Sequence, residues 1–127
     1  MRVANAAVTF GSGATTKAMS ASFNSDPIRV ENLVNAAIQA KFEGGGAPTG
    51  TLKLQASSDV GTDPGTGMSN VTVSNWTDLT GTSQAISASG DHMWTLQNMG
   101  YRWVRIVYTR TSGDDTFSAR LNGKGWG

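Results

Sequence analysis

The sequence predicts an all-β protein, an antiparallel β-sandwich of about eight to nine strands. Short runs in which apolar and polar residues alternate recur along the chain, which is the pattern of half-buried strands. Sixteen glycines, together with many serines and threonines, supply the turns that such a fold needs. Charged residues make up 15% of the chain, against about 25% in an average soluble domain. The 127 residues are expected to form a single domain, residues 1–127, around one core.

The N-terminal part predicts three extended segments. Residues 1–10 form either a first strand or an N-terminal arm, because apolar residues alternate with polar or small ones as far as Phe10. Lys17–Asn24 alternates again and is predicted to be one strand. Asp26-Pro27 ends that strand, since proline cannot donate to a ladder and restricts the residue before it. Ile28 and Val30 begin a short extended piece.

Residues 31–43 fit two patterns. Leu33, Ala37 and Ala40 form a helical stripe, and alanine, glutamine and lysine favour helix. Strict alternation fits the same segment, with its apolar members at positions 34, 36, 38, 40 and 42. We prefer a strand over a helix for 33–42, because the segment lies between other strands and a run of three glycines follows it.

The middle of the chain predicts four more strands and one long loop. Thr51–Ser57 is a strand with Leu52 and Leu54 facing inward. Residues 58–74 have no periodic pattern and are dense in Gly, Pro, Asp and Thr, which indicates a surface loop. Short strands resume at Asn75–Leu79, Gln84–Ala88 and His92–Leu96, and their expected core contacts are Trp76, Ile86, Trp94 and Leu96.

The C-terminal part predicts a long antiparallel hairpin. Tyr101–Arg110 is apolar on nearly both faces and should be a central strand, whereas Thr116–Asn122 alternates and has one face in water. Residues 112–115, Ser-Gly-Asp-Asp, supply the turn. Residues 122–127 form a glycine-rich tail in which little local structure can cover Trp126.

Composition excludes several classes of partner and of chemistry. A net charge of +1 with scattered Lys and Arg predicts neither a nucleic-acid partner nor an acidic membrane partner, because both need a clustered basic surface. The chain has no cysteine, so neither disulfides nor thiolate chemistry are possible. Its N-terminus does not resemble a secretory signal, and no run approaches membrane-spanning length.

The residues do not predict an enzyme, and no cofactor is expected. The chain has one histidine, His92, at a strand start and no Gly-x-Ser-x-Gly elbow. Asp114 and Asp115 are adjacent carboxylates, but neighbours in a strand point to opposite faces, and in a turn they are solvated. No catalytic or metal residue is therefore assigned.

Five residues are candidate contacts with a partner. Asp59 and Asp63 offer hard oxygen ligands that suit calcium, although a solvated acidic loop explains them better. Trp76 borders the long loop and could serve a carbohydrate as a flat platform. Arg2 and Trp126 lie near the two ends of the chain, where a rigid sandwich can present recognition residues.

Three segments of the chain are distinctive: GTLKLQASSD at Gly50–Asp59, YRWVRIVYTRTSG at Tyr101–Gly113 and LNGKG at Leu121–Gly125. With these segments the chain resembles small β-sandwich proteins encoded in the structural gene clusters of tailed bacteriophages, and the resemblance covers residues 20–125. It implies a jelly-roll-like sandwich, similar also to discoidin-type binding modules. These segments are core strands and turns, so they carry over no functional residue.

The resemblance also implies a function in the virion. Members of such groups act as capsid decoration (cement) proteins, so the expected partner is the major capsid protein and the expected location is the capsid surface. Cement gains avidity by bridging subunits or by forming a symmetric homo-oligomer, here a trimer or dimer. The alternative is a carbohydrate- or receptor-binding module of a phage tail or fibre, using Trp76 and the long loop.

Overall fold

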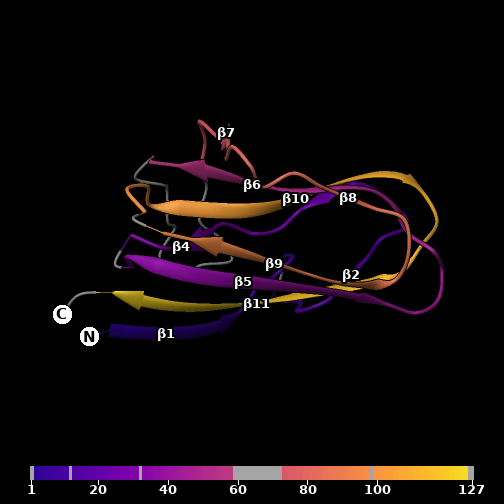
Figure 1. The fold of residues 1–127 in the computed structure, drawn as a ribbon, viewed down its shortest axis with the longest axis horizontal. Helices are drawn as coiled ribbons and strands as arrows, with labels where there is room; N and C mark the ends of the chain where they lie inside the picture. The colour runs from indigo at the N-terminus through magenta and orange to yellow at the C-terminus, as the bar shows by residue number, and fades with distance from the viewer. Residues whose placement is uncertain (1, 12, 32, 59–72, 98, 126–127) are drawn as a thin grey trace.

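The protein is a sandwich of two antiparallel sheets, and in Figure 1 the strands of one sheet (β1, β11, β5 and β9) lie below those of the other (β10, β6 and β7). The computed structural model describes residues 2–11, 13–31, 33–58, 73–97 and 99–125, and for residues 2–4 only the backbone. Sheet A contains β1 (Arg2–Ala7), β2 (Lys17–Ala18), β5 (Asn35–Glu43), β9 (Gly90–Leu96) and β11 (Thr116–Gly125). Sheet B contains β3 (Phe23–Asn24), β4 (Ile28–Arg29), β6 (Thr49–Ser57), β7 (Thr77–Asp78), β8 (Gln84–Ile86) and β10 (Trp103–Ser112).

The eleven strands of the described residues occupy eight positions, because three edge strands are each divided in two. β1 and β2 both pair with β11, β3 and β4 both pair with β10, and β7 and β8 both pair with β6. Sheet A then runs β1/β2–β11–β5–β9, and sheet B runs β3/β4–β10–β6–β7/β8. This order is that of a jelly roll. The predicted β-sandwich is confirmed, and the predicted count of eight to nine strands falls short of eleven because the edge strands are broken in ways that local alternation does not show.

The predicted C-terminal hairpin is wrong. β10 pairs with β3, β4 and β6 in sheet B, whereas β11 pairs with β1, β2 and β5 in sheet A. The two strands therefore face each other across the core, and residues 113–115 cross from one sheet to the other. Alternation shows only which face of a strand points inward. The pattern is the same whether the next strand lies beside that strand in the same sheet or opposite it in the other sheet. β10 is nevertheless central, as predicted, and β11 has one buried face and one wet face.

The predicted strand Lys17–Asn24 is also divided between the sheets. β2 belongs to sheet A and β3 belongs to sheet B, so residues 19–22 form a corner. The alternation of that segment predicts Met19, Ala21 and Phe23 on one face. Met19 and Phe23 are buried, but Ala21 is exposed. Serines on both sides of Ala21 suit a bend better than a continuous strand.

The other segment predictions have mixed outcomes. Residues 35–43 form a strand, as preferred over a helix, and positions 36, 38, 40 and 42 are buried. Residues 2–7 form a strand, so the alternative of a free arm is wrong for them. Asn122–Gly125 belongs to β11, so the glycine-rich tail is wrong for these residues. A Cβ on Gly123 would lie 2.4 Å from Cδ1 of Leu33, which shows that this glycine serves close packing.

Aromatic side chains join the two sheets near the corner between β10 and β11. Phe117 of sheet A is fully buried, and its ring centroid lies 5.4 Å from that of Phe23 in sheet B. Phe10 packs edge-on against both of these rings, and Phe42 stacks on Phe117 at 6.4 Å. Ile86, Trp94 and Leu96 are core residues as predicted. In the described residues, no helix is long and apolar enough to cross a membrane.

Candidate functional site

The candidate binding segments meet at one end of the sandwich. β1 begins there with Arg2 beside Gly125 at the end of β11, on the left of Figure 1. β6 ends at the same place, where Ser57 pairs with Trp103 at the start of β10. We call this the terminal end of the sandwich. It also carries Ser58 and Val73, the described residues on either side of 59–72.

Trp76 lies on the outer face of sheet B and is not the core contact that was predicted. Thr77 pairs with Ala56 and Asp78 with Gln55, so the alternation puts residue 76 on the outward side with Asp78. The indole is half-buried, and its Nε1–H donates to the carbonyl oxygen of Val73 at 3.0 Å. The guanidinium carbon of Arg105 lies 4.4 Å from the ring centroid, so the cation covers one face of the indole.

A chain of polar side chains continues from Arg105 across the outer face. Arg105 Nε donates to Oε1 of Gln55 at 2.8 Å, and Gln55 Nε2 donates to Oδ1 of Asp78 at 2.8 Å. Lys53 Nζ forms an ion pair with Oδ2 of Asp78 at 3.0 Å. Partial burial lowers the pKa of Arg105, which nevertheless stays a cation. The sequence signal for this network is the alternation of β6 and β10, which puts residues 53, 55 and 105 on one outward face.

Asp78 is expected to titrate below an ordinary aspartate. Two hydrogen bonds lower the pKa of Asp78 from the ordinary aspartate value of 3.8. The one from Gln55 has the larger effect, and the one from Lys53 has the smaller. The pKa of Asp78 is lower in the folded protein than in the unfolded chain. The ionised carboxylate therefore stabilises the fold at pH values above the unfolded pKa, and this stabilisation is lost as pH falls through the folded pKa. An NMR titration of the Asp78 carboxyl carbon measures this midpoint. Gln55→Ala should raise it, whereas Thr51→Ala on the same face should not. A midpoint at or above 3.8 in the parent protein would contradict the network.

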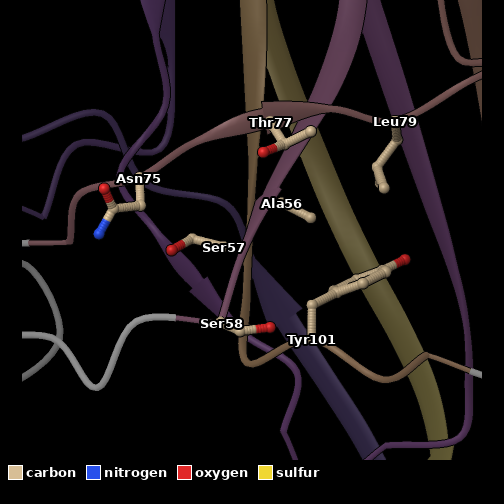
Figure 2. A pocket seen from close by; sticks show the side chains of 7 residues that line it. All are labelled: Ala56, Ser57, Ser58, Asn75, Thr77, Leu79 and Tyr101. Atoms are coloured by element: carbon tan, nitrogen blue, oxygen red, sulfur yellow. The ribbon is translucent and has the colours of Figure 1, made fainter.

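A surface pocket of about 570 Å³ opens at the terminal end between β6, β7 and the segment before β10. Its lining residues are Ala56, Ser57, Ser58, Asn75, Thr77, Leu79 and Tyr101. In Figure 2 the ring of Tyr101 lies on the side of Leu79, and Asn75 lies on the other side with Ser57. Burial raises the pKa of Tyr101, so its phenol stays neutral and able to donate. Sequence reasoning treated Tyr101 only as a strand residue and missed this position.

Asn75 has a backbone conformation that is uncommon for a residue other than glycine. Its φ is +61°, in the left-handed region that asparagine tolerates better than most side chains. This conformation turns the chain between Val73 and β7. It places the exposed amide of Asn75 at the pocket and leaves Trp76 over Arg105.

Of the five sequence candidates, the described residues place two, Arg2 and Trp76, at the terminal end but in different sheets. Asp59, Asp63 and Trp126 lie outside the described part of the chain. The backbone of Arg2 lies in β1 of sheet A, and Trp76 lies on the outer face of sheet B. Within the described ranges, no group of three or more His, Cys, Asp or Glu side chains could hold a metal ion.

Asp115, which was expected to be solvated, is buried at the opposite end of the sandwich. Its side-chain oxygens accept a hydrogen bond from the Ser89 hydroxyl at 2.7 Å and a long one from Gly46 N–H at 3.5 Å. The turn that contains it is packed against residues 44–46, which exclude water from the carboxylate. Asp115 therefore fixes a corner of the fold.

Comparisons with known proteins show a shared fold without a shared family. No family model and no curated protein matches the chain. A solved structure, the SPBc2 prophage-derived protein YomS, matches with a TM-score of 0.54 at 14% identity, over 97% of this chain and 96% of that one. PirA matches over 95% and 92% at 10% identity with a TM-score of 0.42. A Bacillus endospore appendage protein, from a family of disulfide-linked pili, matches over 98% and 87% at 11% identity with a TM-score of 0.36.

Proposed function

We propose that this chain is a non-enzymatic structural protein of a bacteriophage virion, and that it decorates the capsid as a cement protein. The observation that carries the proposal is the gathering of Arg2, Gly125, Ser58 and Val73–Trp76 at one end of a rigid jelly roll. Loops and strand ends held by a rigid scaffold are where such folds recognise partners. The fold shared with a prophage-derived protein, over nearly the whole length of both chains, supports the assignment to a virion.

Under this proposal the terminal end contacts the major capsid protein and the opposite end faces away. Binding at several lattice points at once would raise the overall affinity beyond that of one contact. A ligand that binds only the assembled lattice stabilises it by mass action. Purified protein should therefore co-sediment with capsids that lack it, saturate them at a fixed ratio and raise their melting temperature.

Single cysteines can test which end binds, because the chain has none of its own. Arg102→Cys puts an exposed thiol at the terminal end, just before β10, and Thr111→Cys puts one near the opposite end of the same strand. Each variant is modified with a polyethylene-glycol maleimide and mixed with capsids. We expect modification at position 102 to block co-sedimentation and modification at position 111 to leave it intact. If neither unmodified variant nor the parent protein binds capsids, the cement proposal is wrong.

The second candidate function, a carbohydrate-binding module of a tail or fibre, is supported by the pocket in Figure 2. A sugar ring stacks on aromatic faces and pairs its hydroxyl groups with amides and hydroxyls. The pocket supplies the half-buried ring of Tyr101, the amide of Asn75 and the hydroxyls of Ser58 and Thr77. Arg105 already covers one face of Trp76, so Tyr101 is the better platform.

A glycan array with three variants tests this candidate. Tyr101→Ala should abolish binding, whereas Tyr101→Phe should keep the stacking and weaken binding by a few fold through the lost hydroxyl. Trp76→Ala should have less effect than Tyr101→Ala. A parent protein that binds no glycan on the array would remove this candidate and leave the capsid proposal untouched.

A further inference from the structure

β9 is an edge strand with one unpaired side among the described residues. It pairs with β5 on one side, and on its other side no described strand pairs with it. The other three edges are each interrupted: residues 8–16 separate β1 from β2, residues 25–27 with Pro27 separate β3 from β4, and residues 79–83 separate β7 from β8. Interruptions and prolines are how proteins blunt an edge against pairing with another chain. β9 has neither.

The hydrogen-bond pattern of sheet A shows which residues of β9 face outward along the edge. Val8 N–H donates to the carbonyl oxygen of Ala119, its register partner, at 2.9 Å. Every second residue of β11, counted from Ala119 toward Gly125, therefore forms its backbone hydrogen bonds with β1. The intervening residues of β11, such as Arg120, then bond β5, and the same alternation passes through β5 to β9. Gly90, His92, Trp94 and Leu96 consequently bond β5. The N–H and C=O groups of Asp91, Met93 and Thr95 point to the free edge.

The side chains of the same three residues suit pairing with a second copy. All three are exposed, and Met93, at the middle of β9, is the one exposed large hydrophobic side chain among the described residues, with 52% of its surface accessible. In an antiparallel pair centred on Met93, Met93 meets the partner's Met93, and Asp91 meets the partner's Thr95. Carboxylates are therefore not opposed, and no lysine lies on β9 to repel a second copy.

A groove follows this edge. It has a volume of about 440 Å³ and is lined on one side by His92–Gln97 and on the other by Leu79–Thr82. Its far wall is fixed, because the Trp94 indole N–H donates to the Thr82 carbonyl oxygen at 2.8 Å. The chemistry that matches a row of unpaired backbone groups beside a groove is another extended strand.

We propose that two copies of this chain associate through β9 as an antiparallel two-fold pair centred on Met93. Three hydrogen-bonded residue pairs form: Met93 with the partner's Met93, and each Asp91 with the partner's Thr95. The two sheets A become one continuous sheet, and the same patch serves both copies. This association is a property of the isolated protein and does not depend on the capsid proposal.

Sedimentation equilibrium over about 1 μM to 1 mM protein tests the proposal. The parent protein should fit a monomer–dimer equilibrium. Thr95→Pro removes an N–H that faces the free edge, so the monomer should fold normally while the dimer is lost. Ala7→Pro is the matched control, because the N–H of Ala7 faces outward on the β1 edge, and it should leave the dimer intact. Circular dichroism and thermal unfolding check that both variants fold.

Charge substitutions give opposite effects that a purely structural defect would not. Thr95→Lys opposes each new lysine to the partner's Asp91 and should tighten the dimer several-fold. Thr95→Asp opposes two carboxylates and should weaken it several-fold, and both effects should shrink at high salt. A protein that stays monomeric throughout, a trimer, or a dimer that survives Thr95→Pro would overturn the proposal. A dimer lost only with Ala7→Pro would also overturn it and would assign the contact to β1.

Discussion

Phe117→Ala should be the most destabilising of the single substitutions considered for this protein, lowering the free energy of unfolding by about 3–5 kcal/mol. Phe117 is fully buried and packs against rings of both sheets, with Phe23 of sheet B at 5.4 Å and Phe42 of sheet A at 6.4 Å between centroids. Removing the ring leaves a cavity between the sheets that the neighbouring rings cannot fill without moving their backbones. Urea unfolding of the parent and the variant measures the loss as a change in midpoint.

Two controls separate this effect from a general weakness of the fold. Phe117→Leu keeps much of the volume and should cost clearly less than the alanine variant. Lys124→Ala lies on the exposed face of the same strand, β11, and should change stability by less than about 0.5 kcal/mol. If Phe117→Ala loses less than about 1.5 kcal/mol, the ring does not join the two sheets as described.

Which face of each strand is buried could be predicted from the sequence, but which strands are neighbours could not. The inward positions of β5, β6 and β11 follow the period of two directly. The same period made β10 and β11 read as a hairpin, although they lie in opposite sheets. A three-residue link with small and polar side chains serves a hairpin turn and a crossover equally well. Only the long-range partners of each strand decide between them.

The short edge strands were the second feature that could not be predicted from the sequence. β7 has two paired residues and β8 has three, so a local pattern has little length in which to show itself. The prediction of a core role for Trp76 failed for the same reason, since a shift of one residue moves a side chain to the other face. The pocket residue Tyr101 and the partner of Trp76, Arg105, are both within a run that the sequence identified as structural. Their surface role depends on β6 and β7, which are distant in the sequence.

The corner at the opposite end supplies the second large expected effect, from Gly46→Ala. Residues 44–48 connect β5 in sheet A to β6 in sheet B, and residues 113–115 connect β10 to β11 in the reverse direction. The two corners touch at Gly46, whose carbonyl oxygen accepts a hydrogen bond from Asp114 N–H at 3.1 Å. A Cβ on residue 46 would lie 1.8 Å from the Asp114 carbonyl oxygen, so the backbones would have to separate. We expect a loss of about 2–3 kcal/mol in urea unfolding.

Two other glycines distinguish this close approach from ordinary effects of adding a methyl group. Gly45 has a φ of +75°, but no atom lies within 4 Å of the position that a Cβ would take, so Gly45→Ala measures backbone strain alone, at about 1–2 kcal/mol. Gly100 has neither the positive φ nor a neighbour, and Gly100→Ala should be neutral or slightly stabilising through the unfolded chain. The order Gly46, Gly45, Gly100 should hold from largest to smallest loss. If Gly46→Ala costs no more than Gly100→Ala, the two corners do not touch. That result would mean that the contact with Gly46 does not set the position of the crossover between β10 and β11. Asp115 of the same crossover also accepts a hydrogen bond from Gly46 N–H.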